Sequence, residues 1–335
     1  MNFKTLVSAG ALFASLAGSA VYAQDTQQLR MLNAWDDRFD GTVAIAQAFQ
    51  QCVETATEGR ITFMVSGPEV IPPNQQFDPV SRGLFDVSFI TPIYFLGTTG
   101  VPSAFFALAP DSEMWREKGY WDYADEELGR FNQKLLAFTS GTGASDFYQI
   151  VLREPIAEGD KPLDGRKIRG NKYYEPLVVP MGGSLVNLPG GEIYSALEKG
   201  VVDGAAYPVA GMQRQKMHEV TDYMLRPRFG NSPFLVAMNL DKFNGMGDAD
   251  KEVLLDCGHQ VEASSVEALT ELADATVAEL TELGMQETTL PEAAVAEIEA
   301  GLISGSWQTA IDGNAQTAER VEALREMARA NGDAE

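Results

Sequence analysis

The stretch that decides the fold is KPLDGRKIRGNKYYEPLVVPMGGSLVNLPGGEIYSALEKGVVDGAAYP, residues 161–208. Its pattern predicts a short strand over 165–169 that ends at Arg169, a helix over 191–199 and a second apolar strand over 201–206. This alternation of strand and helix is typical of α/β folds. A strand-end arginine that faces a ligand crevice binds a carboxylate in bidentate fashion, which a lysine does not copy. The segment therefore predicts capture of a small anion.

The same alternation continues on both sides of this segment. Strands are expected over residues 28–33, 60–65, 86–90, 135–139 and 232–239, and helices over 42–57, 77–84, 115–128, 248–284 and 290–331. Such a series predicts mostly parallel sheets with helices on both faces. A chain of 335 residues is too long for one small core and suits two lobes with a ligand cleft between them.

The lobes are predicted to be discontinuous, because the strand over 232–239 is expected to return to the first lobe. We assign residues 24–145 and about 232–270 to the first lobe. The second lobe is assigned residues 146–231 and about 271–335, including the C-terminal helices.

Composition narrows the range of partners. The chain is 45% hydrophobic and 22% charged, as in soluble globular proteins. Its formal net charge is −23, from 48 acidic and 25 basic residues. This balance excludes nucleic acid, whose phosphates need a basic surface, and disfavours docking on anionic membranes.

The first residues read as an export signal. Lys4 supplies the positive start, residues 6–16 the apolar centre and residues 21–23 a small-residue cleavage site before Gln24. We therefore expect residues 1–23 to be removed and the mature protein to reside in the periplasm. No cysteine follows the cleavage site, which argues against a lipid anchor.

The two cysteines, Cys52 and Cys257, leave two readings open. They pair in the oxidising compartment, or they are two buried free thiols. Neither has a CxxC partner or metal-ligand neighbours, so the sequence predicts no metal and no cofactor.

Enzymatic motifs are scarce. The sequence lacks GxSxG, HExxH, GxGxxG and the phosphate-loop pattern, and its two histidines, His218 and His259, lie among ordinary polar residues. Asp36, Asp37 and Asp40 match no calcium loop and are interpreted as a helix-capping group. An exported hydrolase with carboxylates in its cleft remains the alternative from another class. A receptor that signals to a separate membrane kinase is a third possibility.

The candidate binding residues are Arg169 as the anion clamp and a group of aromatic side chains at predicted strand ends or elbows. The aromatic candidates are Trp35, Tyr94, Phe147, Tyr148 and Tyr207, and the polar candidates are Asp146 and Asn171. Together the aromatic side chains predict an apolar or stacking wall opposite the arginine.

At this point a family resemblance is evident. Residues 162–169, Pro-Leu-Asp-Gly-Arg-Lys-Ile-Arg, and residues 190–203, Gly-Gly-Glu-Ile-Tyr-Ser-Ala-Leu-Glu-Lys-Gly-Val-Val-Asp, match two patterns of the solute-binding proteins of TRAP (tripartite ATP-independent periplasmic) transporters. Residues 80–86, followed by Tyr94, are similar to the first-lobe pattern of that family. The "G-G-E-x-Y" form looks most like the branch that binds 2-oxo acids and related monocarboxylates.

The resemblance implies a two-lobed binding protein with a long helix that crosses both lobes. It implies a monomer that closes on an organic anion and delivers it to a membrane permease, with Arg169 matching the family arginine that pairs with the ligand's carboxylate.

Two departures from the family pattern bear on the ligand. An acid and a tryptophan that help to hold a cation in the related branch are replaced by Ala206 and Tyr207, so we expect no bound metal. Phe147 stands where a polar or basic residue is usual. We therefore expect a monoacid (carboxylate or sulfonate) or, alternatively, a zwitterion whose cationic end meets aromatic faces and Asp146 or Asp36.

Overall fold

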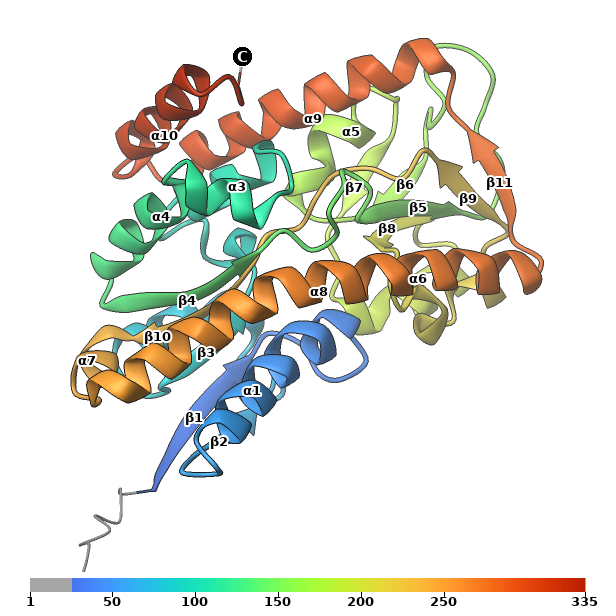
Figure 1. Ribbon diagram of the computed structural model, residues 1–335. Helices are drawn as coiled ribbons and strands as arrows, with labels where there is room; N and C mark the ends of the chain where they lie inside the picture. Colours follow the sequence, from blue (N-terminus) through green and yellow to red (C-terminus); the bar gives the residue numbers. More distant parts are fainter. Residues whose placement is uncertain (1–25, 335) are drawn as a thin grey trace, which may run out of the picture.

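The computed structural model describes residues 26–334, which form two α/β lobes, each built on one β-sheet (Figure 1). The first sheet has the order β2-β1-β3-β10-β4. Its strands are β1 (Gln27–Asn33), β2 (Ile61–Ser66), β3 (Val87–Ile90), β4 (Gln133–Thr139) and β10 (Phe234–Asn239). The second sheet has the order β11-β9-β5-β8-β6-β7. Its strands are β5 (Tyr148–Leu152), β6 (Lys167–Arg169), β7 (Ser184–Val186), β8 (Gly204–Pro208), β9 (Tyr223–Arg226) and β11 (Gln286–Thr289).

Both sheets are mostly parallel, as the sequence pattern predicts, and each contains one antiparallel strand. In the first sheet β1 runs parallel to β2 and β3, but β10 runs antiparallel to β3 and β4. In the second sheet β5 runs antiparallel to β8 and β9. The strands that follow a passage between lobes need no crossover helix within their own sheet, so nothing forces them to run parallel to their neighbours. The predicted return of the chain to the first lobe through β10 is confirmed.

Helices cover the sheets and fill the ends of the lobes. They are α1 (Ala48–Ala56), α2 (Phe77–Ser81), α3 (Ser112–Glu117), α4 (Tyr120–Gly129), α5 (Glu175–Val178), α6 (Ile193–Glu198), α7 (Leu240–Asn244), α8 (Asp248–Glu282), α9 (Glu292–Gly313) and α10 (Ala318–Ala330). Shorter turns of π or 3-10 type are η1 (Thr42–Gln47), η2 (Pro73–Gln75), η3 (Pro92–Phe95), η4 (Pro102–Ala107), η5 (Lys172–Tyr174), η6 (Gly190–Glu192), η7 (Met212–Gln215) and η8 (Met217–Glu219). The single helix expected over 115–128 is instead α3 and α4, because Gly119 adopts a φ of 77° between them.

The predicted long helix is α8, whose 35 residues run along both lobes (Figure 1). Leu254 belongs to the core that includes β1 and β4 of the first lobe. Near the other end, Leu280 packs in the core of the second lobe with Val151 of β5. The helix α8 therefore packs against the cores of both lobes and connects them. None of the helices among residues 26–334 is long and apolar enough to cross a membrane.

The C-terminal helices contact both lobes. Ile298 and Leu302 of α9 share a cluster with Leu177 of α5, in the second lobe. Trp307, later in α9, packs in a cluster with Phe105 and Trp115 of the first lobe. The buried face of α10 belongs to that first-lobe cluster, whereas the lobe boundaries expected from the sequence place α10 in the second lobe.

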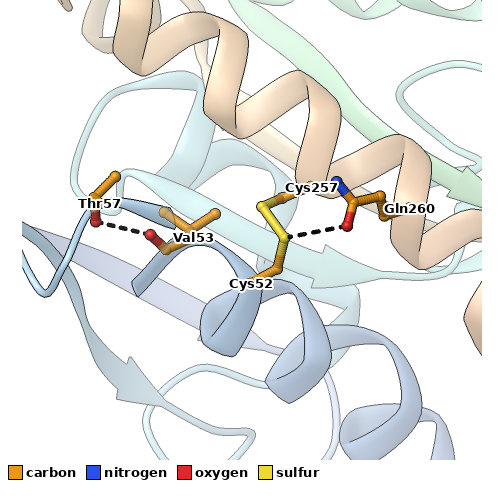
Figure 2. Close-up of a disulfide and its surroundings, with 5 residues drawn as sticks. All are labelled: Cys52, Val53, Thr57, Cys257 and Gln260. Atoms are coloured by element: carbon orange, nitrogen blue, oxygen red, sulfur yellow. Dashed lines mark hydrogen bonds between the residues drawn. A yellow bond between two sulfur atoms is a disulfide. The ribbon is translucent and has the colours of Figure 1, made fainter. Parts of the chain in front are cut away.

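The two cysteines form a disulfide that joins α1 to α8 (Figure 2). The Cα atoms of Cys52 and Cys257 are 5.7 Å apart, although the residues are separated by 205 positions in the sequence. This resolves the alternative that the sequence left open. A cross-link over such a long loop restricts the unfolded chain strongly and fastens α8 to the first lobe.

Candidate ligand-binding site

Arg169 is the last residue of β6, between β7 and β8 in the second sheet. Its Nε and Nη2 donate to the carbonyl oxygen of Leu188 at 3.0 and 2.9 Å, and its Nη1 donates to that of Ala206 at 3.1 Å. The side chain is half-buried. Among residues 26–334, no carboxylate forms an ion pair with this guanidinium.

This arrangement leaves Arg169 with unused binding capacity. A guanidinium carries five N–H donors, and the three bonds to carbonyl oxygens occupy three of them. Carbonyl acceptors fix the plane of the side chain, but they do not neutralise its positive charge. A half-buried cation with two free N–H groups is suited to an anion, above all a planar carboxylate.

Four tyrosines lie close enough to Arg169 for its charge to act on their hydroxyls. They are Tyr94 of η3 in the first lobe and Tyr148, Tyr174 and Tyr207 in the second. Burial raises the pKa of each hydroxyl, to about 12 for Tyr207, while the nearby Arg169 opposes the rise. The hydroxyls therefore stay protonated and remain hydrogen-bond donors. The ring centroid of Tyr207 is 6.0 Å from Cζ of Arg169.

Trp35 joins this group from the first lobe. It follows β1, is half-buried, and its ring centroid lies 5.5 Å from that of Tyr94 and 4.8 Å from that of Phe39. Phe89 and Phe234 pack on the same indole ring, at 5.4 and 5.6 Å. The aromatic side chains thus continue from the core of the first lobe to the tyrosines around Arg169.

Phe147 supports this group from behind. It is 1% exposed and packs between Tyr148 and Phe234, with centroid distances of 4.8 and 5.5 Å. Gly141 lies against it in the first passage between lobes, where a Cβ would come within 2.8 Å of the Phe147 ring. Phe147 therefore supports the ring of Tyr148 and has almost no exposed surface with which to contact a ligand.

The two polar candidates have structural partners. The carboxylate of Asp146 is paired with Arg228, which also binds Asp274 of α8 at 3.1 Å. Asp146 additionally accepts a hydrogen bond from Thr142 Oγ1 at 3.0 Å. Asn171 caps η5, because its side-chain oxygen accepts from the backbone N–H of Tyr173 at 2.9 Å. Asn171 thus shapes the turn after Arg169, and Asp146 does not join the tyrosines.

The family model of DctP, described as bacterial extracellular solute-binding protein, family 7, matches residues 40–304. The chain belongs to this family. DctP-family members are TRAP solute-binding proteins, and they are periplasmic receptors rather than enzymes. The hydrolase alternative is therefore dropped. The expected signal peptide, residues 1–23, lies outside the described residues.

Two curated relatives indicate the range of ligands in the family. The monocarboxylate 2-oxoacid-binding periplasmic protein of Nostoc sp. is 27% identical over 186 residues, 53% of this chain and 50% of the relative. The ectoine/5-hydroxyectoine-binding periplasmic protein UehA of Ruegeria pomeroyi is 28% identical over 194 residues, 54% of each chain. The chain thus spans about half the length of these two relatives.

Solved structures show the same fold over nearly the whole chain. A TRAP periplasmic solute-binding protein from Desulfovibrio salexigens, with bound orotic acid, has a TM-score of 0.75 at 18% identity, covering 90% of this chain and 98% of that one. One from Rhodoferax ferrireducens, with bound malonate, has a TM-score of 0.75 at 17% identity, covering 90% and 99%. The predicted two-lobed α/β architecture is confirmed.

The candidate site also includes Tyr174, which sequence reasoning missed. The turn η5, capped by Asn171, brings the Tyr174 ring over the backbone directly after Arg169, where a Cβ on Gly170 would approach the ring to 2.7 Å. A glycine directly after the strand-end arginine, with tyrosines three and four residues later, is the signal that was available. It points to a ring packed on the strand end.

Proposed function

We propose that this chain is the periplasmic receptor of a TRAP transporter that binds a small organic monoacid (carboxylate or sulfonate) and delivers it, as a monomer, to the membrane permease. The observation that carries the proposal is the guanidinium of Arg169, which lacks an acidic partner among the described residues and lies among tyrosines from both lobes. A carboxylate there gains charge-assisted bonds from the arginine and further bonds from protonated hydroxyls.

A single negative charge fits this site better than two. The other cation whose field reaches Tyr207 is Arg38, and it is already paired with Asp36 at 2.7 Å. Arg38 lowers the pKa of Asp36 through their hydrogen bonds, so Asp36 stays ionised. A second carboxylate on the ligand would therefore approach a neutralised pair instead of a free cation.

A zwitterion is the second candidate, supported by the aromatic side chains. The faces of Trp35 and Tyr207 suit the cationic end of such a ligand. UehA, by its name, binds ectoine and 5-hydroxyectoine, and the Nostoc relative binds 2-oxo acids. Both candidates use Arg169 for the acid group.

A thermal-shift screen followed by calorimetry tests the proposal. The panel contains 2-oxo monoacids, other monocarboxylates, sulfonates, dicarboxylates and zwitterions of similar size. We expect stabilisation by monoacids or zwitterions, because a ligand that binds only the folded state raises its melting temperature. Stabilisation by dicarboxylates alone would contradict the proposal.

The role of Arg169 is tested by replacing it in the protein that binds the best ligand of the panel. Arg169→Ala is expected to weaken binding at least 100-fold, because it removes the charge and the bidentate geometry together. Arg166→Ala is the matched control, since Arg166 also donates only to backbone carbonyls, those of Glu154 and Pro155, and does not act on the tyrosine pKa values. Equal affinity in both variants would remove Arg169 from the site.

Delivery and oligomeric state are tested separately. Uptake into proteoliposomes that contain the permease should require the receptor and be lost with Arg169→Ala. Light scattering should give the mass of one chain with and without ligand.

A further inference from the structure

Asp40 and Arg214 form an ion pair beside the proposed site, between two segments that belong to different lobes. Asp40 lies in the loop between β1 and η1, five residues after Trp35. Arg214 lies in η7, seven residues after Tyr207 of β8. The pair thus joins the loop that carries Trp35 to the segment that follows Tyr207.

The two partners differ in their burial. The side chain of Asp40 is 3% exposed, whereas that of Arg214 is 42% exposed. Burial raises the pKa of Asp40, and Arg214 opposes that rise. A carboxylate is withdrawn from water at a cost that only a nearby cation offsets, so the buried position of Asp40 depends on Arg214.

The backbone of the second lobe is shaped to receive Asp40. Gly211 adopts a φ of 74°, and a Cβ at this position would overlap with Oδ2 of Asp40. The N–H of Gly211 donates to Thr276 Oγ1 of α8 at 3.3 Å, and Thr276 Oγ1 donates to Gln213 at 3.2 Å. The segment 211–214 is therefore fastened to α8 while its glycine leaves room for the carboxylate of the other lobe.

We infer that Asp40 and Arg214 are positioning residues that latch the two lobes together and so slow the release of the ligand. The inference rests on the proposed receptor function, because only lobe closure around a ligand gives such a latch its purpose. When the lobes separate, Arg214 is already accessible to water and Asp40 becomes so. Opening of the lobes therefore breaks the pair, and closure forms it again.

The kinetic test uses Asp40→Asn, Arg214→Gln and the double variant, with Trp35 as the optical probe in stopped-flow mixing. Each single variant is expected to raise the dissociation rate of the best ligand about tenfold and to leave the association rate nearly unchanged. The double variant should be no faster than either single variant, because the two changes remove one interaction.

Arg30 and Asp86 provide the matched control. They form the same kind of pair with nearly the same exposure, 41% for the arginine and 8% for the aspartate, but both lie in the first lobe. Asp86→Asn should lower the melting temperature and leave ligand release unchanged. A dissociation rate for Asp40→Asn within twofold of wild type, or an equal increase for Asp86→Asn, would overturn the inference.

A second measurement separates failure of the latch from failure of the proposed function. Spin labels on Leu84→Cys in the first lobe and Val179→Cys in the second, both exposed positions, report the distance between lobes without ligand. Asp40→Asn should shift the distribution to longer distances even when no acid in the panel binds. Identical distributions in the two proteins would refute the latch, whatever the screen shows.

Discussion

Two half-buried arginines of this molecule, Arg116 and Arg169, have opposite surroundings. Arg116 of α3 reaches Glu262 of α8 through two hydrogen bonds, of 2.5 and 2.9 Å, and lies over the ring of Trp121. Arg169 donates to carbonyl oxygens and has no acidic partner in the described part of the chain. The difference shows that burial alone does not distinguish the two arginines. The missing counterion and the protonated hydroxyls around Arg169 distinguish them, and these are the features on which the proposed role of Arg169 rests.

The carboxylate of Glu262 accepts four hydrogen bonds from protein groups. Its Oε1 accepts from the indole N–H of Trp121 at 2.9 Å and from the backbone N–H of Phe138 at 2.6 Å, in addition to the bond from Arg116. Burial still raises the pKa of Glu262 above its ordinary value, because these partners only partly offset the loss of water. This carboxylate connects α8 to β4 and neutralises the charge of Arg116, so this arginine does not offer an unpaired cation to a ligand.

The largest effect that would test the comparison between Arg116 and Arg169 is a loss of stability, which is expected from Glu262→Gln. The change should lower the free energy of unfolding by about 3 kcal/mol, since it leaves Arg116 without its counterion. The value lies at the lower end for a buried pair because Arg116, 25% exposed, still reaches water. Urea unfolding measures the loss.

The ligand affinity of the Glu262→Gln protein should stay within twofold of wild type. A variant that keeps its stability but loses ligand binding would reverse the roles given to the two regions.

The sequence predicts the elements that carry these two arginines better than it predicts their partners. The strand that ends at Arg169 and the helix α8 follow from local periodicity, which depends on neighbouring residues only. Whether an arginine meets a carboxylate depends on contacts between distant segments, such as Arg116 with Glu262 or Asp146 with Arg228. The same reason explains why the pairing of the cysteines and the packing of α10 were not predictable.

A smaller effect, on ligand affinity, is expected near Arg169, where Tyr174 can be compared with its neighbour Tyr173. Both tyrosines are buried, but the charge of Arg169 acts on the pKa of Tyr174 and not on that of Tyr173. Tyr174→Phe should weaken ligand binding about tenfold, the effect of losing one hydrogen bond to a charged group. Tyr173→Phe should leave the affinity unchanged. Calorimetry with the same ligand compares the two variants, and equal affinities would exclude the Tyr174 hydroxyl from the site.

The smallest effect is the response of ligand affinity to pH. Since burial raises the pKa of Tyr207 to about 12 and also raises those of Tyr94, Tyr148 and Tyr174, ligand affinity should be constant between about pH 7 and 10. Stability should respond instead. Unfolded tyrosines ionise near pH 10 while the buried ones stay neutral, so the free energy of unfolding is fully retained below about pH 10 and falls as pH rises toward the folded pKa values.

Parallel titrations of affinity and melting temperature would distinguish these responses. A loss of affinity beginning near pH 8 would mean that one of the hydroxyls ionises in the folded protein. The resulting tyrosinate would then pair with Arg169, and Arg169 would no longer differ from Arg116 in lacking a counterion.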